Sequence, residues 1–211
     1  MFDDDLLVRS NYWLRDIRYI PTIFTSNLFG FDADNPICNY YRPLVNVFLM
    51  LTYHIFGPHP WGFHLVNILF HTANSVLVFL LASSLHAEFP PSNRGGRLAP
   101  FSAAFVCALL FATHPVHTEA VAWVAGLSDV SYTCFYLISL FLYIRSIRTS
   151  QSLTGARTLS VYAFFLAMLC KEPALTLPAL LIAHDLALGE GPILAAGTLK
   201  RYLPYLAAAA C

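Results

Sequence analysis

Long apolar stretches separated by short polar segments follow one another along most of this chain. A helix needs about 20 apolar residues in line to cross a hydrocarbon layer, although buried or re-entrant helices can be shorter. The pattern predicts one short or tilted helix, five membrane helices after it, and the beginning of a sixth. These elements cover 43–57, 61–86, 98–113, 129–147, 158–170, 174–188 and the stretch from 201 onward. The predicted fold is therefore an all-α, polytopic integral membrane helical bundle.

The composition agrees with this class of protein and excludes others. Hydrophobic residues make up 57% of the 211 residues, whereas soluble domains have about 45–50% apolar residues. Mean hydropathy is +0.60 and the formal net charge is zero, so we expect no nucleic-acid partner. The five cysteines show no paired metal-binding spacing and are interpreted as small core residues.

Arginine and lysine positions orient the predicted helices. Most of them lie in or beside three segments, 88–97, 148–157 and 189–201, which the positive-inside rule places on the cytoplasmic side. The exceptions near the start of the chain are Arg9, Arg15, Arg18 and Arg42. Residues 1–42 then form an outer or lumenal loop, and 43–211 form the transmembrane bundle. The acidic start and the apolar end of the sequence lead us to expect a fragment of a longer protein, with a further helix upstream.

One predicted helix carries a polar stripe. His64, Asn67, His71 and Asn74 are spaced by 3, 4 and 3 residues, which stacks their side chains on one helical face. Ionisable and amide groups at membrane depth are costly, and they either line a water-filled cavity or join helices through hydrogen bonds. The spacing is compatible with both interpretations.

Two further polar segments interrupt apolar stretches. His114, His117 and Glu119 follow a predicted helix, where they could bind zinc or pack a re-entrant turn as hydrogen-bonded side chains. Pro115 favours the second interpretation. Lys171 begins the next outer corner, where a lysine either holds a phosphate or extends its ammonium to the membrane surface.

The predicted outer loop contains a candidate interfacial helix at 12–24. Its pattern places Trp13, Ile17 and Ile20 together, with charged residues at 15, 16 and 18 between them. A helix of this kind would lie in the plane of the membrane surface. It would act either as a platform beside an active site or as a simple anchor.

Three consecutive carboxylates, Asp3, Asp4 and Asp5, open the chain. An acidic run of this kind is usually a solvated flank of a membrane segment. Neighbouring carboxylates can also raise the pKa of one member, which suits a general base that faces an acceptor hydroxyl.

Several blocks together resemble the transmembrane and tetratricopeptide-repeat (TMTC-type) family. They are FDD followed by NLFGF, then YYRPLVNVFLMLTYHIFG, GFHLVNILFHTANSVLVFLL, FATHPVHTEAVAWVAG and CKEPALTLPALLIAHDL, in order through residues 2–188. The resemblance implies a GT-C glycosyltransferase fold. It also implies an enzyme that moves a sugar, expected to be mannose, from a polyprenyl (dolichyl) phosphate donor to Ser or Thr hydroxyls of proteins. No 34-residue repeat is visible in this chain.

The resemblance also suggests roles for particular residues. Asp3 and Asp4 align with the acidic pair of the family, so one of them is expected to be the catalytic base. Arg42 and Lys171 are the outer cations expected to bind the donor phosphate. The expected cavity lining is His64, Asn67, His71, His114, His117 and Glu119, and no metal site is expected. The sequence Gly126-Leu127-Ser128-Asp129 departs from the Gly-Arg that often precedes this Asp in the family.

The implied partners are membrane lipid, the polyprenyl phosphate sugar and an acceptor protein. The compartment would be the endoplasmic reticulum membrane in a eukaryote or the cytoplasmic membrane in a bacterium. Two other functions compete with the transferase: a non-catalytic membrane scaffold, and a lipid or solute transporter that uses the polar stripe. Transporters often contain internal repeats, and none is evident here.

Overall fold

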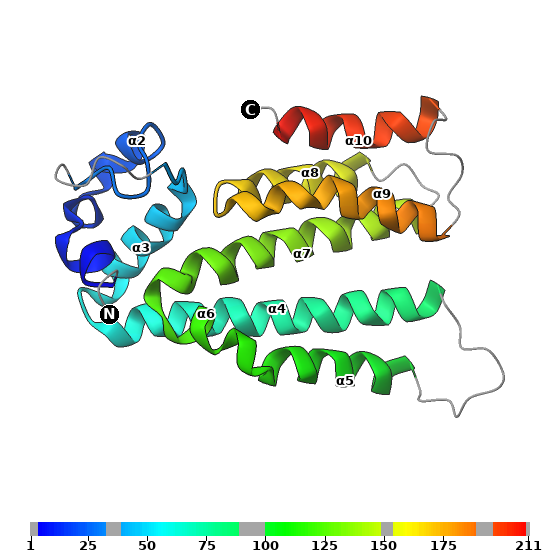
Figure 1. The fold of residues 1–211 in the computed structure, drawn as a ribbon, viewed down its shortest axis with the longest axis horizontal. Helices are drawn as coiled ribbons and strands as arrows, with labels where there is room; N and C mark the ends of the chain where they lie inside the picture. The colour runs from blue at the N-terminus through cyan, green and yellow to red at the C-terminus, as the bar shows by residue number, and fades with distance from the viewer. Residues whose placement is uncertain (1–3, 33–38, 89–99, 149–153, 189–195, 210–211) are drawn as a thin grey trace.

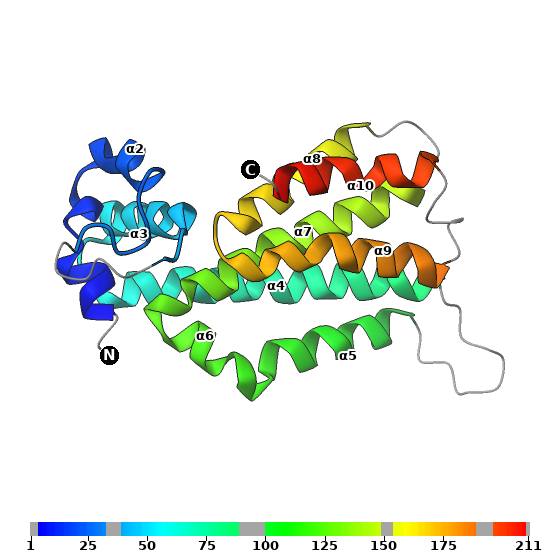
Figure 2. The same cartoon turned by 45° about the horizontal axis from the view of Figure 1, so that its top comes forward.

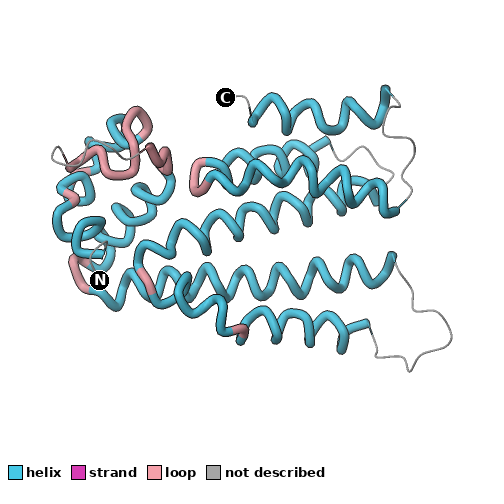
Figure 3. The backbone as a smooth tube through the Cα atoms, viewed as in Figure 1, coloured by secondary structure: helices cyan, strands magenta, loops and turns pink. Residues whose placement is uncertain are grey.

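The computed structural model describes residues 4–32, 39–88, 100–148, 154–188 and 196–209 (Figure 1). The described part of the chain consists of helices and the turns that join them, with no strand (Figure 3). The long helices are α3 (Pro43–Phe56), α4 (Pro60–Glu88), α5 (Pro100–Thr113), α7 (Leu127–Arg148), α8 (Thr154–Met168), α9 (Leu177–Leu188) and α10 (Ala196–Ala209). The prediction of an all-α bundle is confirmed.

Short helical turns connect the long helices. Those of the amino-terminal segment are η1 (Asp5–Ser10), η2 (Tyr12–Arg15), η3 (Ile17–Tyr19) and α2 (Ile20–Ile23). Between α5 and α7 lie η4 (Pro115–His117), α6 (Thr118–Ala122) and η5 (Val124–Gly126), and η6 (Glu172–Thr176) precedes α9. These turns, with the amino-terminal segment, gather at one end of the bundle (Figures 1 and 2).

Proline and glycine set several helix boundaries. The helices α3, α4 and α5 each begin at a proline, whose fixed φ suits a first helical position and whose missing N–H would have no partner there. The helix α3 ends at Gly57, which has φ of +66°, a backbone conformation that side chains with a Cβ rarely adopt. The chain then turns into α4, so α3 and α4 are joined by a tight corner.

The helix α7 lies in the middle of the bundle, with α4 and α5 on one side and α8, α9 and α10 on the other (Figures 1 and 2). One apolar core joins the amino-terminal segment and α3 to α4 and the start of α7. A second core joins the rest of α7 to α8, α9 and α10. The other end of the bundle, away from the amino-terminal segment, contains the first turns of α8 and α10 and the last turns of α7 and α9 (Figures 1 and 2).

Length and composition make this a membrane protein. Pro60–Leu85 and Val124–Ile147 are long and apolar enough to cross a bilayer, and Phe101–Thr113 with Pro115–Ala122 would make a third span bent by 45°. The other predicted spans are shorter. The 15 residues of α8 and the 12 of α9 extend about 22 and 18 Å at 1.5 Å per residue, less than a hydrocarbon core of about 30 Å. The predicted cytoplasmic and outer sides stay predictions.

The prediction of one continuous helix at 12–24 is wrong, and its position at the membrane surface stays a prediction. Asp16 has extended backbone angles (φ −144°, ψ 118°), and its side chain caps the turn that follows, so this segment is split into η2, η3 and α2. Trp13 is only 2% exposed and packs edge-on against Phe31 at 5.7 Å, whereas Ile17 is 60% exposed. The three apolar residues therefore do not form one face, because Trp13 belongs to the core.

Two asparagines attach the amino-terminal segment to α3. The buried Asn11 accepts a hydrogen bond from the N–H of Trp13 and donates one to Asn46 in α3, at 3.1 and 3.4 Å. Asn46 in turn donates to the carbonyl oxygen of Leu28 at 3.1 Å. Buried amides with partners stabilise a specific arrangement, so these contacts hold the segment against α3.

Candidate functional site

A cavity of about 600 Å³ lies at the end of the bundle where the amino-terminal segment packs. Its wall combines residues of α4, the α6–η5 turn, the first turns of α7 and the corner after α8 with residues of the amino-terminal segment. Segments distant in sequence thus meet around one space, which is the arrangement usual for a binding site.

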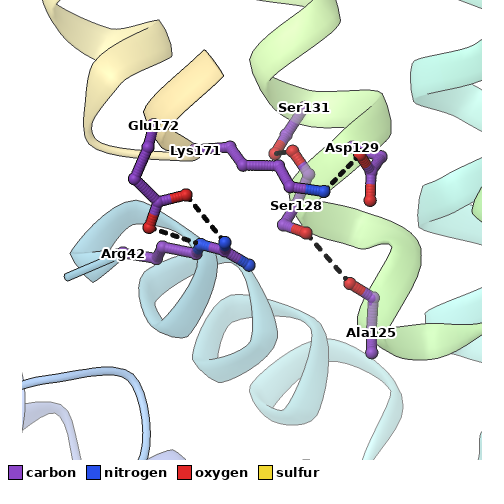
Figure 4. Close-up of polar contacts among 7 residues, drawn as sticks. All are labelled: Arg42, Ala125, Ser128, Asp129, Ser131, Lys171 and Glu172. Carbon is purple, nitrogen blue, oxygen red and sulfur yellow. Dashed lines mark hydrogen bonds and ion pairs between the residues drawn. The ribbon is translucent and has the colours of Figure 1, made fainter. Parts of the chain in front are cut away.

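Two ion pairs lie at this cavity (Figure 4): Arg42, Lys171 and Asp129 line its wall, and Glu172 pairs with Arg42 from outside the lining. The Arg42 guanidinium donates to both carboxylate oxygens of Glu172, at 3.2 and 2.7 Å, and the Lys171 ammonium lies 2.5 Å from Asp129 Oδ1. The side chains of Arg42 and Lys171 are 13% and 23% exposed, while both carboxylates are more open to solvent. The cations are thus largely enclosed beside the cavity, and their partners hold them in position.

The local backbone explains why the two pairs are neighbours. Arg42 directly precedes α3, and the N–H of Leu44 in its first turn donates to the carbonyl oxygen of Leu169 at 3.3 Å. Lys171 is extended (φ −162°, ψ 143°) between α8 and η6, next to Glu172. This backbone contact therefore brings the start of α3 to the corner after α8, where the four charges meet.

The Arg42–Glu172 pair changes the acidity of the glutamate. Burial alone would raise the pKa of Glu172, but the hydrogen bonds from Arg42 and the nearby positive charges outweigh this effect and lower it. Glu172 is therefore ionised at neutral pH, as an ion pair with Arg42 requires.

The α6–η5 turn forms another wall and is attached to α4 by Asn67. The Asn67 amide is buried and donates to the carbonyl oxygen of Trp123 at 2.7 Å. Gly126 closes the turn, and a Cβ at this position would overlap the backbone of Ala120. A side chain at 126 would therefore push the two arms of the turn apart.

This turn binds one of the opening carboxylates. Asp4 Oδ1 accepts a hydrogen bond from the N–H of Ala125 at 3.3 Å, and Ala125 is part of the cavity wall. The sequence-predicted Asp4 thus lies beside the cavity that contains Arg42 and Lys171. Asp3 and the side chain of Asp5 lie outside the described residues.

The structure divides the other residues predicted to line a cavity. His71, His117 and Glu119 lie in the wall of this cavity. His114 instead lines a smaller space of about 280 Å³, which His71 and His117 also border. The rings of His71 and His117 are 5.4 Å apart, and those of His114 and His117 are 6.1 Å apart. In the described part of the chain, no group of three His, Cys, Asp or Glu side chains is arranged to hold a metal ion.

Like His114, two more of the predicted lining residues are not in the wall of the larger cavity. The buried amide of Asn67 lies in the contact between α4 and the α6–η5 turn. Its role in this structure is to join these two elements by a hydrogen bond. His64 lies seven residues before His71, about 10 Å along the helix axis, and is outside the wall. Asn74 combines both roles, because it lines the cavity and donates to the carbonyl oxygen of Val130 at 2.9 Å.

The sequence did not identify Asp129 or Glu172 as members of the site. A signal for them was present, because Lys171 and Arg42 adjoin apolar segments and a largely enclosed cation needs a counter-charge. Asp129 lies in the first turn of α7, and Glu172 follows Lys171 directly. Neither position, however, shows from the sequence which cation it pairs with.

The fold and the cavity define a class: an all-α membrane protein with an ion-paired, carboxylate-bearing cavity at one end of its bundle. Human protein O-mannosyl-transferase TMTC4 is 35% identical over 196 residues, which cover 88% of this chain and 26% of the relative. The mouse protein of the same name is 34% identical over 207 residues, covering 93% of this chain and 28% of the relative. The Drosophila melanogaster protein O-mannosyl-transferase Tmtc3 is 29% identical over 200 residues, covering 88% of this chain and 22% of the relative.

The chain belongs to the TMTC-type family. It spans about a quarter of the length of the curated relatives it matches. No family model matches the chain, and no solved structure matches it.

Proposed function

We propose that this chain is the membrane portion of a protein O-mannosyltransferase. The proposed reaction transfers mannose from a polyprenyl phosphate donor to a Ser or Thr hydroxyl of an acceptor protein. The reaction type is that named for the relatives, which are protein O-mannosyl-transferases. The compartment would be the endoplasmic reticulum membrane or, in a bacterium, the cytoplasmic membrane.

One observation carries the proposal: a single cavity has two largely enclosed cations, Arg42 and Lys171, in its wall beside the turn that binds Asp4. A lipid-linked sugar phosphate needs positive groups at its phosphate, a base near its anomeric carbon and an apolar surface for its tail. Arg42 and Lys171 provide the positive groups, Asp4 beside the wall is the candidate base, and the neighbouring helices expose apolar side chains.

In the proposed reaction the Asp4 or Asp3 carboxylate accepts the proton of the acceptor hydroxyl. The hydroxyl oxygen forms a bond to the anomeric carbon of mannose, and the bond from that carbon to the phosphate oxygen breaks. The polyprenyl phosphate leaves with the electron pair, and Arg42 and Lys171 stabilise its added negative charge. The pairs with Glu172 and Asp129 keep both cations oriented for this task.

The experiment compares acid-to-amide variants in the full-length protein. Purified wild type, Asp3→Asn, Asp4→Asn and the double variant are given polyprenyl phosphate mannose and an acceptor peptide, and glycopeptide mass spectrometry measures transfer. A general base contributes about 10²–10⁴-fold in rate, so at least one single variant should lose that much activity. The matched control is Asp16→Asn, which alters a partly exposed aspartate paired with Arg18, away from the cavity wall, and should leave transfer unchanged.

Undiminished transfer in the single and double variants would exclude both residues as the base. Absence of transfer by the wild type would favour the non-catalytic scaffold. Correct folding of each variant is checked by its thermal unfolding.

A further inference from the structure

A second group of positive side chains lies at the opposite end of the bundle, between α8 and α10. Its members are Arg157 near the start of α8 and Lys200 and Arg201 near the start of α10. We call this group the α8–α10 basic seam. It is far from the cavity, because both helices begin at the end opposite the amino-terminal segment (Figures 1 and 2).

Helix register brings the two arginines together. The Tyr205 hydroxyl of α10 donates to Ser160 Oγ of α8 at 2.7 Å, which fixes the alignment of the two helices. Arg157 lies three residues before Ser160, and Arg201 lies four residues before Tyr205, each on the same helical face as that contact. Since α8 and α10 run in the same direction, both arginines lie about one turn from the contact toward the same end.

Both arginines contain buried nitrogen atoms without a hydrogen-bond acceptor. These atoms are Arg157 Nε and Arg201 Nη1. A buried donor that lacks an acceptor destabilises the folded protein, so these two atoms need an acceptor that the neighbouring side chains do not supply. An oxygen-rich anion seated between α8 and α10 would supply them.

The neighbouring carboxylate does not satisfy this need. Asp185 lies 3.8 Å from Arg201 Nη1, which is too far for a hydrogen bond. It already accepts hydrogen bonds from the hydroxyls of Tyr143 and Tyr202, at 2.7 and 2.6 Å. The three cations of the seam also outnumber this carboxylate, so the seam carries a net positive charge.

Exposed apolar side chains continue from the seam along both helices. Leu159 and Tyr162 on α8 and Leu203 and Leu206 on α10 are each at least 50% exposed. In a membrane protein such side chains contact acyl chains. The surface is thus cationic at the bundle end and apolar beyond it, which matches an anionic lipid better than a free anion.

We propose that the α8–α10 basic seam binds the phosphate headgroup of an anionic phospholipid, with the acyl chains along the exposed apolar faces of α8 and α10. Arg157 and Arg201 donate to the phosphate oxygens, and Lys200 adds attraction at the surface. The predicted cytoplasmic placement of this end agrees with the proposal, because that side faces anionic lipids. The site is separate from the proposed transferase cavity and does not depend on it.

The test titrates detergent-purified full-length protein with phosphatidylglycerol, with phosphatidylcholine and with inorganic phosphate, and native mass spectrometry counts bound molecules. Wild type should prefer phosphatidylglycerol. Each cation near a membrane surface contributes about fivefold in affinity, so Arg157→Gln should weaken phosphatidylglycerol binding about fivefold and Arg157→Gln with Arg201→Gln about 25-fold. Arg18→Gln is the matched control, because Arg18 is exposed in the amino-terminal segment, and it should bind like the wild type.

Three results would overturn the proposal: equal affinity for both lipids in the wild type, unchanged phosphatidylglycerol affinity in the glutamine variants, or phosphate binding as tight as lipid binding. The last would indicate a simple anion site. If the double variant fails to fold, the proposal is tested with the single glutamine variants. It is also tested with Arg157→Lys and Arg201→Lys, which keep the positive charge. The lysine variants should retain most of the lipid preference, and loss of that preference in correctly folded lysine variants would also contradict the proposal.

Discussion

Replacing Gly126 by alanine tests whether the α6–η5 turn is as tightly closed as the structure indicates. A Cβ at this position would meet the Ala120 carbonyl oxygen and would come within 2.8 Å of the Ala120 carbonyl carbon and Cα. These are backbone atoms, so no side-chain rotation can relieve the overlap. Over-packing of this kind typically costs about 1–3 kcal/mol. We therefore expect Gly126→Ala to lower the free energy of unfolding by this amount.

The matched control is Gly155→Ala. A Cβ at Gly155 meets no atom within 4 Å, and this residue lies in α8. Alanine is a better helix former than glycine, so the control should be neutral or stabilised by up to about 1 kcal/mol. Tryptophan fluorescence during thermal unfolding of the full-length protein compares the two variants. Equal stability of Gly126→Ala and the wild type would refute the close approach of the turn.

Three further predictions concern the core, the ion pair and the orientation. Asn67→Leu should destabilise the protein by about 1–3 kcal/mol in the same unfolding assay, because it removes a buried amide and leaves the Trp123 carbonyl oxygen without its donor; unchanged stability would contradict this. The Arg42–Glu172 pair should stabilise the protein above pH 4.5, the ordinary pKa of Glu172, and this contribution should fade as the pH falls through the lowered pKa in the folded protein. Its size is at most about 1 kcal/mol because Glu172 is half exposed, and Glu172→Gln should remove this pH dependence. With the native cysteines replaced, an impermeant thiol reagent applied to the outer or lumenal face should label Thr22→Cys and not Gly155→Cys, and the reverse result would invert the orientation.

The apolar pattern was sufficient to place the long helices, because a membrane helix is defined by its own length and composition. The predicted segment 61–86 and the observed α4, Pro60–Glu88, differ by only two residues at the later end. The amino-terminal segment could not be placed in this way. Its helical turns are set by the caps of Asn11 and Asp16 and by burial of Trp13 against Phe31, and these contacts depend on residues brought together by folding.

The sequence predicted several charged residues of the site, but it did not predict which side chains contact one another. Lys171, Arg42 and Asp4 were expected from their unusual positions and from family resemblance, and the structure brings them to one cavity region. The polar stripe of α4 was compatible with two roles, and periodicity cannot choose between them. Asn67 and His71 share that stripe, yet only His71 reaches the cavity, because the choice depends on how α6 and α7 pack against α4.

Photo-crosslinking with the donor tests the central claim most directly. Full-length protein is irradiated with a polyprenyl phosphate mannose analogue that carries a photoreactive group next to the phosphate, and peptide mass spectrometry maps the labelled residues. The account predicts labels in 120–133 or beside Arg42 and Lys171, with labelling lost when excess unlabelled donor is present. Labels confined to α8 and α10, or labels in the cavity that unlabelled donor does not suppress, would contradict the assignment of this cavity as the donor site.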